Sequence, residues 1–83
     1  MIELKGLEIE YYVHDEQCEQ AENLGMHRPL EEHDLRRCTL YSMSAVTEEL
    51  KCTAVVCDGG QFQTPESYES LLKRIELNKV NIF

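Results

Sequence analysis

The sequence predicts an α+β fold: a small antiparallel sheet of four to five strands with a C-terminal amphipathic helix packed on one face. Three observations predict it. Short segments with strand composition recur along the chain, an Asp-Gly-Gly turn separates two of them, and apolar residues recur at helical spacing near the C-terminus. Because the chain has only 83 residues, we expect a single domain that covers residues 1–83.

Residues 7–13 are expected to form the first strand, because apolar and polar side chains alternate along them. Leu7 and Ile9 would then share the buried face, with Glu8 and Glu10 on the other. Ile2 and Leu4 are out of phase with this alternation, so we expect a bulge or tight turn at residues 5–6.

The next segment is expected to be a short helix, residues 14–24, that ends at Gly25. Its apolar side is small, with Cys18 and Ala21 at its centre, so the helix requires packing on the sheet to be stable. Pro29 is then expected to open a short helical turn that holds Leu30 and Leu35.

A three-stranded antiparallel meander is expected from residues 38–46, 50–57 and 61–64. The polar residues 47–49 would form the turn between the first two strands. Residues 58–60, Asp-Gly-Gly, would form the hairpin turn between the last two, because glycine adopts positive φ without steric penalty.

The C-terminal helix is expected over residues 65–78, with Thr64 as N-cap, Pro65 at the first helical position and Asn78 as its stop. Its apolar residues recur at positions i, i+3, i+4 and i+7. The expected core consists of these helix residues and one or more from each strand of the meander: Leu40 or Tyr41, Val55 or Val56, Phe62, Tyr68, Leu71, Leu72 and Ile75.

From Cys38 to Ile75, the layout resembles the small FlbD-type flagellar-associated proteins. The segment CTAVVCDGGQFQTPESYESLLKRI (residues 52–75) shows this resemblance, with strand, glycine turn, short strand and amphipathic helix in the same order. It covers under half of the chain, and the acidic stretch before Cys38 departs from it. The resemblance implies a similar arrangement of elements, and we carry over no function from it.

The net charge of −8 is confined to residues 1–34, which hold ten acidic and two basic residues; residues 35–83 hold six of each. This acidity argues against direct contact with nucleic acid or with anionic membranes. It has two explanations: a solvated face that maintains solubility, or a docking surface for a basic protein partner. The candidate partner-binding residues are Glu8, Glu10, Asp15, Glu16, Glu19, Glu22, Glu31 and Glu32. They would form one surface if the first helix packs beside the first strand.

No enzymatic motif is found, so we expect no catalytic residue, no cofactor and no metal ion. Zinc would require clustered ligands among His14, Cys18, His27, His33, Cys38, Cys52 and Cys57, but no C-x-x-C pair exists. The two closest arrangements are His14 and Cys18 on one helix face, and Cys38 opposite Cys57 if residues 47–48 form a two-residue loop. His33 and Cys38 are close in sequence, but no signature of a catalytic cysteine surrounds them.

These features favour a non-enzymatic interaction or regulatory module. We expect it in the cytoplasm of a bacterium or encoded by a phage, because no signal peptide, membrane span or eukaryotic targeting signal is found. Its cysteines are then expected to be reduced. Two alternatives stay open: an inhibitor that mimics nucleic-acid charge, and a small zinc-binding domain. A homodimer through a sheet edge or the tail, residues 80–83, is a further expectation.

Overall fold

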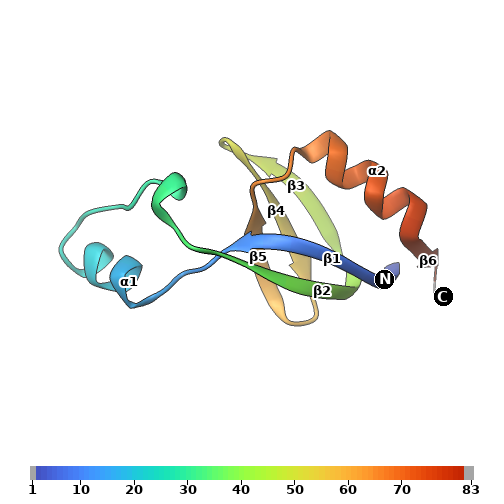
Figure 1. The fold of residues 1–83 in the computed structure, drawn as a ribbon, viewed down its shortest axis with the longest axis horizontal. Helices are drawn as coiled ribbons and strands as arrows, with labels where there is room; N and C mark the ends of the chain where they lie inside the picture. The colour runs from blue at the N-terminus through green and yellow to red at the C-terminus, as the bar shows by residue number, and fades with distance from the viewer. Residues whose placement is uncertain (1, 82–83) are drawn as a thin grey trace.

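A computed structural model gives the fold and describes residues 2–81 (Figure 1). Over these residues the chain is α+β and its strands pair antiparallel, which confirms the predicted class. In chain order the elements are β1 (Ile2–Tyr12), α1 (Glu16–Asn23), a 3₁₀ turn η1 (Leu30–Glu32), β2 (Leu35–Met43), β3 (Ala45–Glu49), β4 (Cys52–Cys57), β5 (Gly60–Thr64), α2 (Tyr68–Asn78) and β6 (Lys79–Asn81).

The described strands form two sheets of three, in the orders β2-β1-β6 and β3-β4-β5, and not one sheet of four to five strands. The predicted strand over residues 38–46 is in fact two strands, broken at Ser44, that belong to different sheets. The predicted turn at residues 47–49 is wrong, because these residues lie in β3 with Glu49 paired to Cys52. Their polar side chains are exposed because β3 is an edge strand. Polar residues are favoured both on edge strands and in turns, so composition alone does not distinguish the two.

The predicted irregularity in β1 is confirmed. The register of β1 on β2 shifts between Glu3 and Leu7, and Gly6 has a φ of +71° there. This positive φ allows Leu4 and Leu7 to point to the same side, and both are buried.

The core lies between the two sheets and α2, which packs on β1 and β3. It contains Leu4, Leu7, Ile9, Leu40, Met43, Val55, Leu71 and Ile75. Leu40 and Val55 are the buried members of their pairs, whereas Tyr41 and Val56 are exposed. Phe62 and Tyr68 are half-buried. The prediction for Leu72 is wrong, since it is exposed at the edge of the helix stripe.

Helix α2 begins later than predicted. Ser67 is its N-cap, and the Ser67 hydroxyl accepts a hydrogen bond from the Ser70 amide at 3.2 Å. Thr64 is instead the last residue of β5, fully buried and paired with Thr53, so it cannot cap the helix. Asn78 ends α2 as predicted, and its side-chain oxygen accepts from the Lys5 amide at 2.7 Å.

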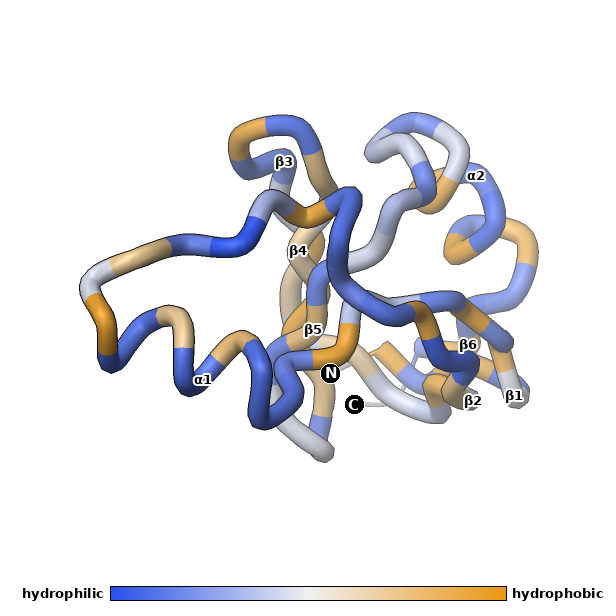
Figure 2. Tube along the Cα trace, turned by 60° about the vertical axis from the view of Figure 1, so that its left-hand side comes forward, coloured by the Kyte–Doolittle hydropathy of each residue, from blue (hydrophilic) through white to orange (hydrophobic). Residues whose placement is uncertain are grey.

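Residues 13–34 project from the sheets as an arm, which contains α1 and η1 (Figure 1). The arm lengthens the molecule to 45 Å, against 22 and 18 Å along its other axes. Helix α1 is thus formed on the projecting arm, whereas the sequence led us to expect that it would require packing on the sheet to be stable. Much of the arm is coloured hydrophilic in Figure 2, so its sequence provides little apolar surface for packing.

Local hydrogen bonds stabilise α1 in place of sheet packing. The helix ends at Gly25 as predicted, with φ +75°. The Met26 amide donates to the Ala21 carbonyl at 2.8 Å and the Gly25 amide to the Glu22 carbonyl at 2.9 Å. This is the Schellman arrangement, which satisfies carbonyls at a helix end that would otherwise lack partners. The predicted turn after Pro29 is η1, although Leu35 lies beyond it at the start of β2.

Candidate functional site

The arm carries most of the net charge of the protein. Residues 13–34 contain seven acidic residues and one basic residue, for a net charge of −6 out of −8. Six of the eight predicted partner-binding residues lie on it: Asp15, Glu16, Glu19, Glu22, Glu31 and Glu32. Glu8 and Glu10 lie on β1 in the body of the protein. Because α1 does not pack beside β1, the predicted single acidic surface is divided into two parts.

Three acidic residues at the start of α1 occupy positions where negative charge favours the helix. Asp15 is the N-cap, and its Oδ1 accepts from the Cys18 amide at 3.0 Å. This hydrogen bond is the main reason why the pKa of Asp15 lies below its ordinary value. Glu16 and Glu19 lie in the first turn, near the positive end of the helix dipole. Within residues 2–81 neither has an ion-pair partner, so both carboxylates face solvent as free charges.

Arg28 is the one basic residue of the arm, and it joins the start of α1 to the turn η1. Its Nη2 donates to the Glu32 carbonyl at 2.6 Å, and its Nη1 lies 3.5 Å from Asp15 Oδ1. The Arg28 side chain is only 22% exposed. It therefore neutralises charge at Asp15 and Glu32, and it makes no ion pair with Glu16 or Glu19 of α1.

Cys18 and His33 meet at the base of the arm, where the chain leaves β1 and returns to β2. Cys18 Sγ lies 3.6 Å from each ring nitrogen of His33 and 3.7 Å from Arg28 Nη1. The Val13 amide donates to the Asp34 carbonyl at 2.8 Å beside them, which extends the β1–β2 ladder. Cys18 is only 3% exposed, so this contact fixes the arm and presents no accessible nucleophile.

The sequence analysis missed this contact because Cys18 and His33 are fifteen residues apart. Its proposed partner for Cys18, His14, precedes the N-cap and therefore does not share a helix face with Cys18. His14 instead lies 3.7 Å from Glu22. The apolar character of Cys18 and the closure of the arm by two adjacent strands are the only signals that could have indicated the pair.

The two-residue loop at residues 47–48 that would set Cys38 opposite Cys57 is not formed, because both residues lie in β3. Cys38 pairs with Ile9, and Cys57 pairs with Gly60 across the Asp58-Gly59 turn. The two thiols nonetheless line one small pocket of about 260 Å³ between the sheets. Burial raises the pKa of Cys38, with a smaller contribution from Cys57, so a reactive thiolate is disfavoured.

The metal-ligand candidates do not converge. In the part of the chain that the structure describes, no group of three or more His, Cys, Asp or Glu side chains is placed to hold a metal ion. Cys52 donates to the Glu49 carbonyl at 3.3 Å, His27 is exposed on the arm, and His33 contacts Cys18 rather than Cys38. The zinc-binding alternative therefore gains no geometric support from these residues.

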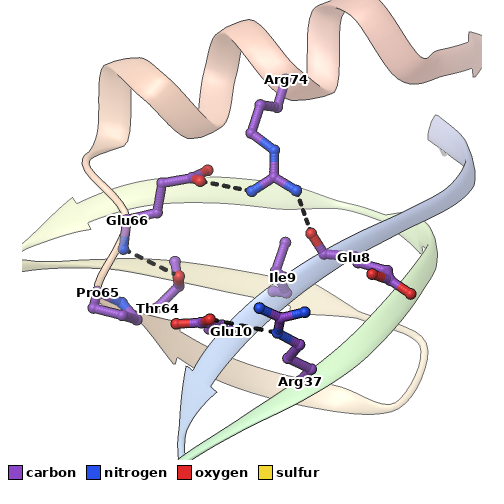
Figure 3. Close-up of a pocket in the computed structure, with 8 residues that line it drawn as sticks. All are labelled: Glu8, Ile9, Glu10, Arg37, Thr64, Pro65, Glu66 and Arg74. Carbon is purple, nitrogen blue, oxygen red and sulfur yellow. Dashed lines mark hydrogen bonds and ion pairs between the residues drawn. The ribbon is translucent and has the colours of Figure 1, made fainter.

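A cleft of about 520 Å³ lies in the body of the protein, and it includes the other two predicted residues, Glu8 and Glu10 (Figure 3). Its walls come from β1, from Arg37 of β2, from the segment between β5 and α2, and from Arg74 of α2. Arg74 crosses from the helix towards β1, where its Nη2 donates to the Glu8 carbonyl. Arg37 Nε lies 3.5 Å from Glu10 Oε1, which is the residue directly opposite it in the β1–β2 ladder.

Glu66 has the most constrained position in this cleft. Its Oε1 accepts from Arg74 Nη1 at 2.6 Å, and its amide donates to the Thr64 hydroxyl at 3.3 Å. Its second carboxylate oxygen, Oε2, is buried and has no hydrogen-bond partner among the described residues. A buried acceptor without a donor is unfavourable, and such groups usually have a missing partner.

The tail predicted to mediate a homodimer is only partly described. Val80 and Asn81 belong to β6 and pair with Glu3 and Ile2 of β1, so β6 is the edge strand on that side of the sheet. Ile82 and Phe83 lie outside the described residues. Dimerisation through the tail or a sheet edge stays a prediction.

No protein-family model matches this chain, and neither does any curated protein or solved structure with which it was compared. The resemblance of residues 38–75 to FlbD-type proteins thus gains no support from a family match. None of the helices between residues 2 and 81 is long and apolar enough to cross a lipid bilayer.

Proposed function

We propose that the protein is a non-enzymatic interaction module whose acidic arm docks on a basic surface of a protein partner. One observation carries this proposal: a net charge of −6 on a segment that projects from the core and contributes none of the core side chains. A charge that served only solubility could be spread over the whole surface and would not need to be concentrated on one projecting element. A projecting charged element presents its field to a partner and accelerates association.

The arm is ordered by contacts of its own, which also supports docking. The Asp15 cap, the Gly25 end of α1 and the Arg28 bridge order the backbone from which the carboxylates extend before a partner arrives. A preorganised surface loses less conformational entropy on binding than a flexible one. The acidic residues therefore form a defined pattern of charge.

The test is capture of partners from a lysate of the native host at low and high salt, with wild-type protein and two double variants. In the arm variant, Glu16→Gln and Glu19→Gln remove two unpaired carboxylates of α1. In the matched control, Glu48→Gln and Glu69→Gln remove the same charge from exposed positions of β3 and α2.

We expect a partner that is retained at low salt, released at high salt, and lost by the arm variant but not by the control. Capture that is insensitive to salt, or equal for both variants, would overturn the proposal. Release of the partner by duplex DNA would identify the narrower case of a nucleic-acid mimic.

A further inference from the structure

An apolar groove of about 360 Å³ lies between α2, the start of β3 and the first residue of β1. Six apolar side chains form most of its lining: Ile2, Met43, Ala45, Val46, Leu72 and Ile75. Met43 and Ile75 are buried, Ile2 and Val46 are half-buried, and Leu72 is 38% exposed. The groove therefore continues the core to the surface of the protein, where an apolar occupant would remove further apolar area from water.

The charged residues of the groove neutralise each other. Lys79 Nζ lies 2.8 Å from Glu76 Oε2, and among the described residues no other charged side chain lines the groove. A charged ligand would therefore find no unpaired counter-charge there. The groove favours an apolar occupant, in contrast to the acidic arm, which lies at the other end of the molecule from β6 (Figure 1).

The path of β6 leads the chain along this groove. Lys79 of β6 lines the groove, and Asn81 lies directly opposite Ile2, which lines it as well. The description ends at Asn81, and the sequence continues with Ile82 and Phe83. Two residues of extended chain span about 7 Å. Two large apolar side chains of the same chain thus follow within reach of the groove.

Strand alternation selects which of these two side chains faces the groove. Residues directly opposite each other in an antiparallel pair have their side chains on one face of the sheet, so Asn81 shares the face of Ile2. That face also carries the buried Leu4. Because successive side chains of a strand point to opposite faces, a chain that continues β6 carries Phe83 on the face of Asn81 and Ile82 on the other.

The groove has room for an aromatic ring, because an apolar cavity of about 150 Å³ is sufficient to hold benzene. We propose that the groove is the docking site of residues 82–83 of the same chain, with the ring of Phe83 between Leu72 of α2 and Val46 of β3. This tail is a strap that ties the three-residue β6 to the helix and to both sheets. The inference is independent of the proposed function, because the arm takes no part in the groove.

Through-space proton contacts, measured by NMR on wild-type protein labelled with carbon-13, test this docking directly. We expect cross-peaks between the Phe83 ring and the methyl groups of Val46, Leu72 and Ile75. A sample that mixes labelled and unlabelled chains separates contacts within one chain from contacts between chains. Cross-peaks found only between chains would assign the groove to a second copy, and the absence of cross-peaks to all three residues would remove its occupant. Either result would overturn the proposal.

Substitutions in the tail measure what the ring contributes to stability. Phe83→Ala is expected to raise the equilibrium constant for unfolding, measured in urea, roughly tenfold or more, because it removes a buried aromatic side chain. Ile82→Ala is the matched control on the opposite face of the strand, with an expected change of less than about threefold. Equal effects of the two substitutions would contradict the assignment of Phe83 to the groove.

A double-mutant cycle tests the contact between the ring and the groove wall. Val46→Ala is expected to raise the unfolding constant less in the Phe83→Ala background than in wild type, by a factor of about two or more, because side chains in contact are energetically coupled. Leu77→Ala, an exposed position of α2 outside the groove, is expected to be additive with Phe83→Ala. Additivity of the Val46 cycle would overturn the proposed contact.

The same variants distinguish this docking from the dimer through the tail that the sequence predicts. A ring held in its own groove is not available to a second copy, so wild type and Phe83→Ala are expected to have the same mass by light scattering. A wild-type dimer that becomes a monomer in Phe83→Ala would show that the ring docks on another chain, and the proposal would be wrong.

Discussion

Replacement of Arg28 by methionine is expected to loosen the arm and leave the core intact. Methionine keeps an unbranched side chain with good helix propensity but removes every hydrogen bond of the guanidinium. The bonds lost join the two halves of the arm: Arg28 Nη2 to the Glu32 carbonyl, and Nη1 to Asp15 and to Cys18 Sγ. The net charge of the arm also changes from −6 to −7.

The magnitude follows from the bond to the Glu32 carbonyl, which holds the guanidinium against Asp15 and Cys18 at the start of α1. A hydrogen bond with one charged partner contributes roughly 1.5–3 kcal/mol. The Arg28 side chain is 22% exposed, so we take the lower end, about 1.5 kcal/mol. Since 1.4 kcal/mol corresponds to a factor of ten, amides of α1 are expected to exchange with solvent roughly tenfold faster in the variant.

Hydrogen exchange resolved by residue measures this change, with Arg36→Met as the control. Arg36 is exposed on β2 and has no ion pair or side-chain hydrogen bond among residues 2–81. The control is expected to leave exchange of residues 18–26 unchanged, and both variants are expected to retain protection in β4. Unchanged exchange of α1 in Arg28→Met, or an equal loss in β4, would refute the reasoning.

Three further predictions concern stability. Leu71→Ala is expected to lower the free energy of unfolding in urea by about 2–5 kcal/mol, because Leu71 is fully buried. Leu77 lies on the same helix and is 90% exposed, so Leu77→Ala is expected to change the free energy of unfolding by under about 0.5 kcal/mol. Equal effects of the two substitutions would contradict the packing of α2. Leu50→Gly is expected to raise the urea midpoint, because Leu50 has φ +53° at the β3–β4 turn and its side chain is exposed. Relief of this backbone strain, roughly 1–2 kcal/mol, exceeds the entropic penalty of glycine, roughly 0.5–1 kcal/mol. A lower midpoint would show that the leucine is needed. The pKa of Asp15 lies below its ordinary value in the folded arm, so its support of α1 is present above about pH 4 and lost as pH falls further; amide protection in α1 that persists undiminished to pH 2 would contradict this.

Elements with a strong local pattern could be predicted from the sequence. The alternation along β1 and the irregularity at residues 5–6 follow from residue type, and both were predicted. Gly25 likewise indicated the end of α1. In each case the determining contacts lie within a few residues, so local chemistry is sufficient.

The division into two sheets could not be predicted in the same way. The break at Ser44 has no glycine or proline to mark it, and the turn at Leu50 uses a residue that seldom adopts positive φ. Thr64 and Ser67 are both good N-caps by residue type. The choice between them is made by the pairing of Thr64 with Thr53 in β4, a tertiary contact.

The candidate site was predicted in composition but not in arrangement. The acidic residues of the first 34 positions are visible in the sequence, whereas their division between arm and cleft depends on where α1 lies. The cleft itself brings Glu10 together with Glu66 and Arg74, which lie far from it in the chain. No local pattern of charge indicates such a convergence.

The pairing of β6 with β1 has a consequence for how the protein folds. Ile2 lies opposite Asn81, so this contact joins residues at the two ends of the described chain. Contacts of such long sequence separation slow folding, because a large loop must close before the contact forms. On a ribosome, the sheet of β1 and β2 must wait until residue 81 has been made before its third strand can be added.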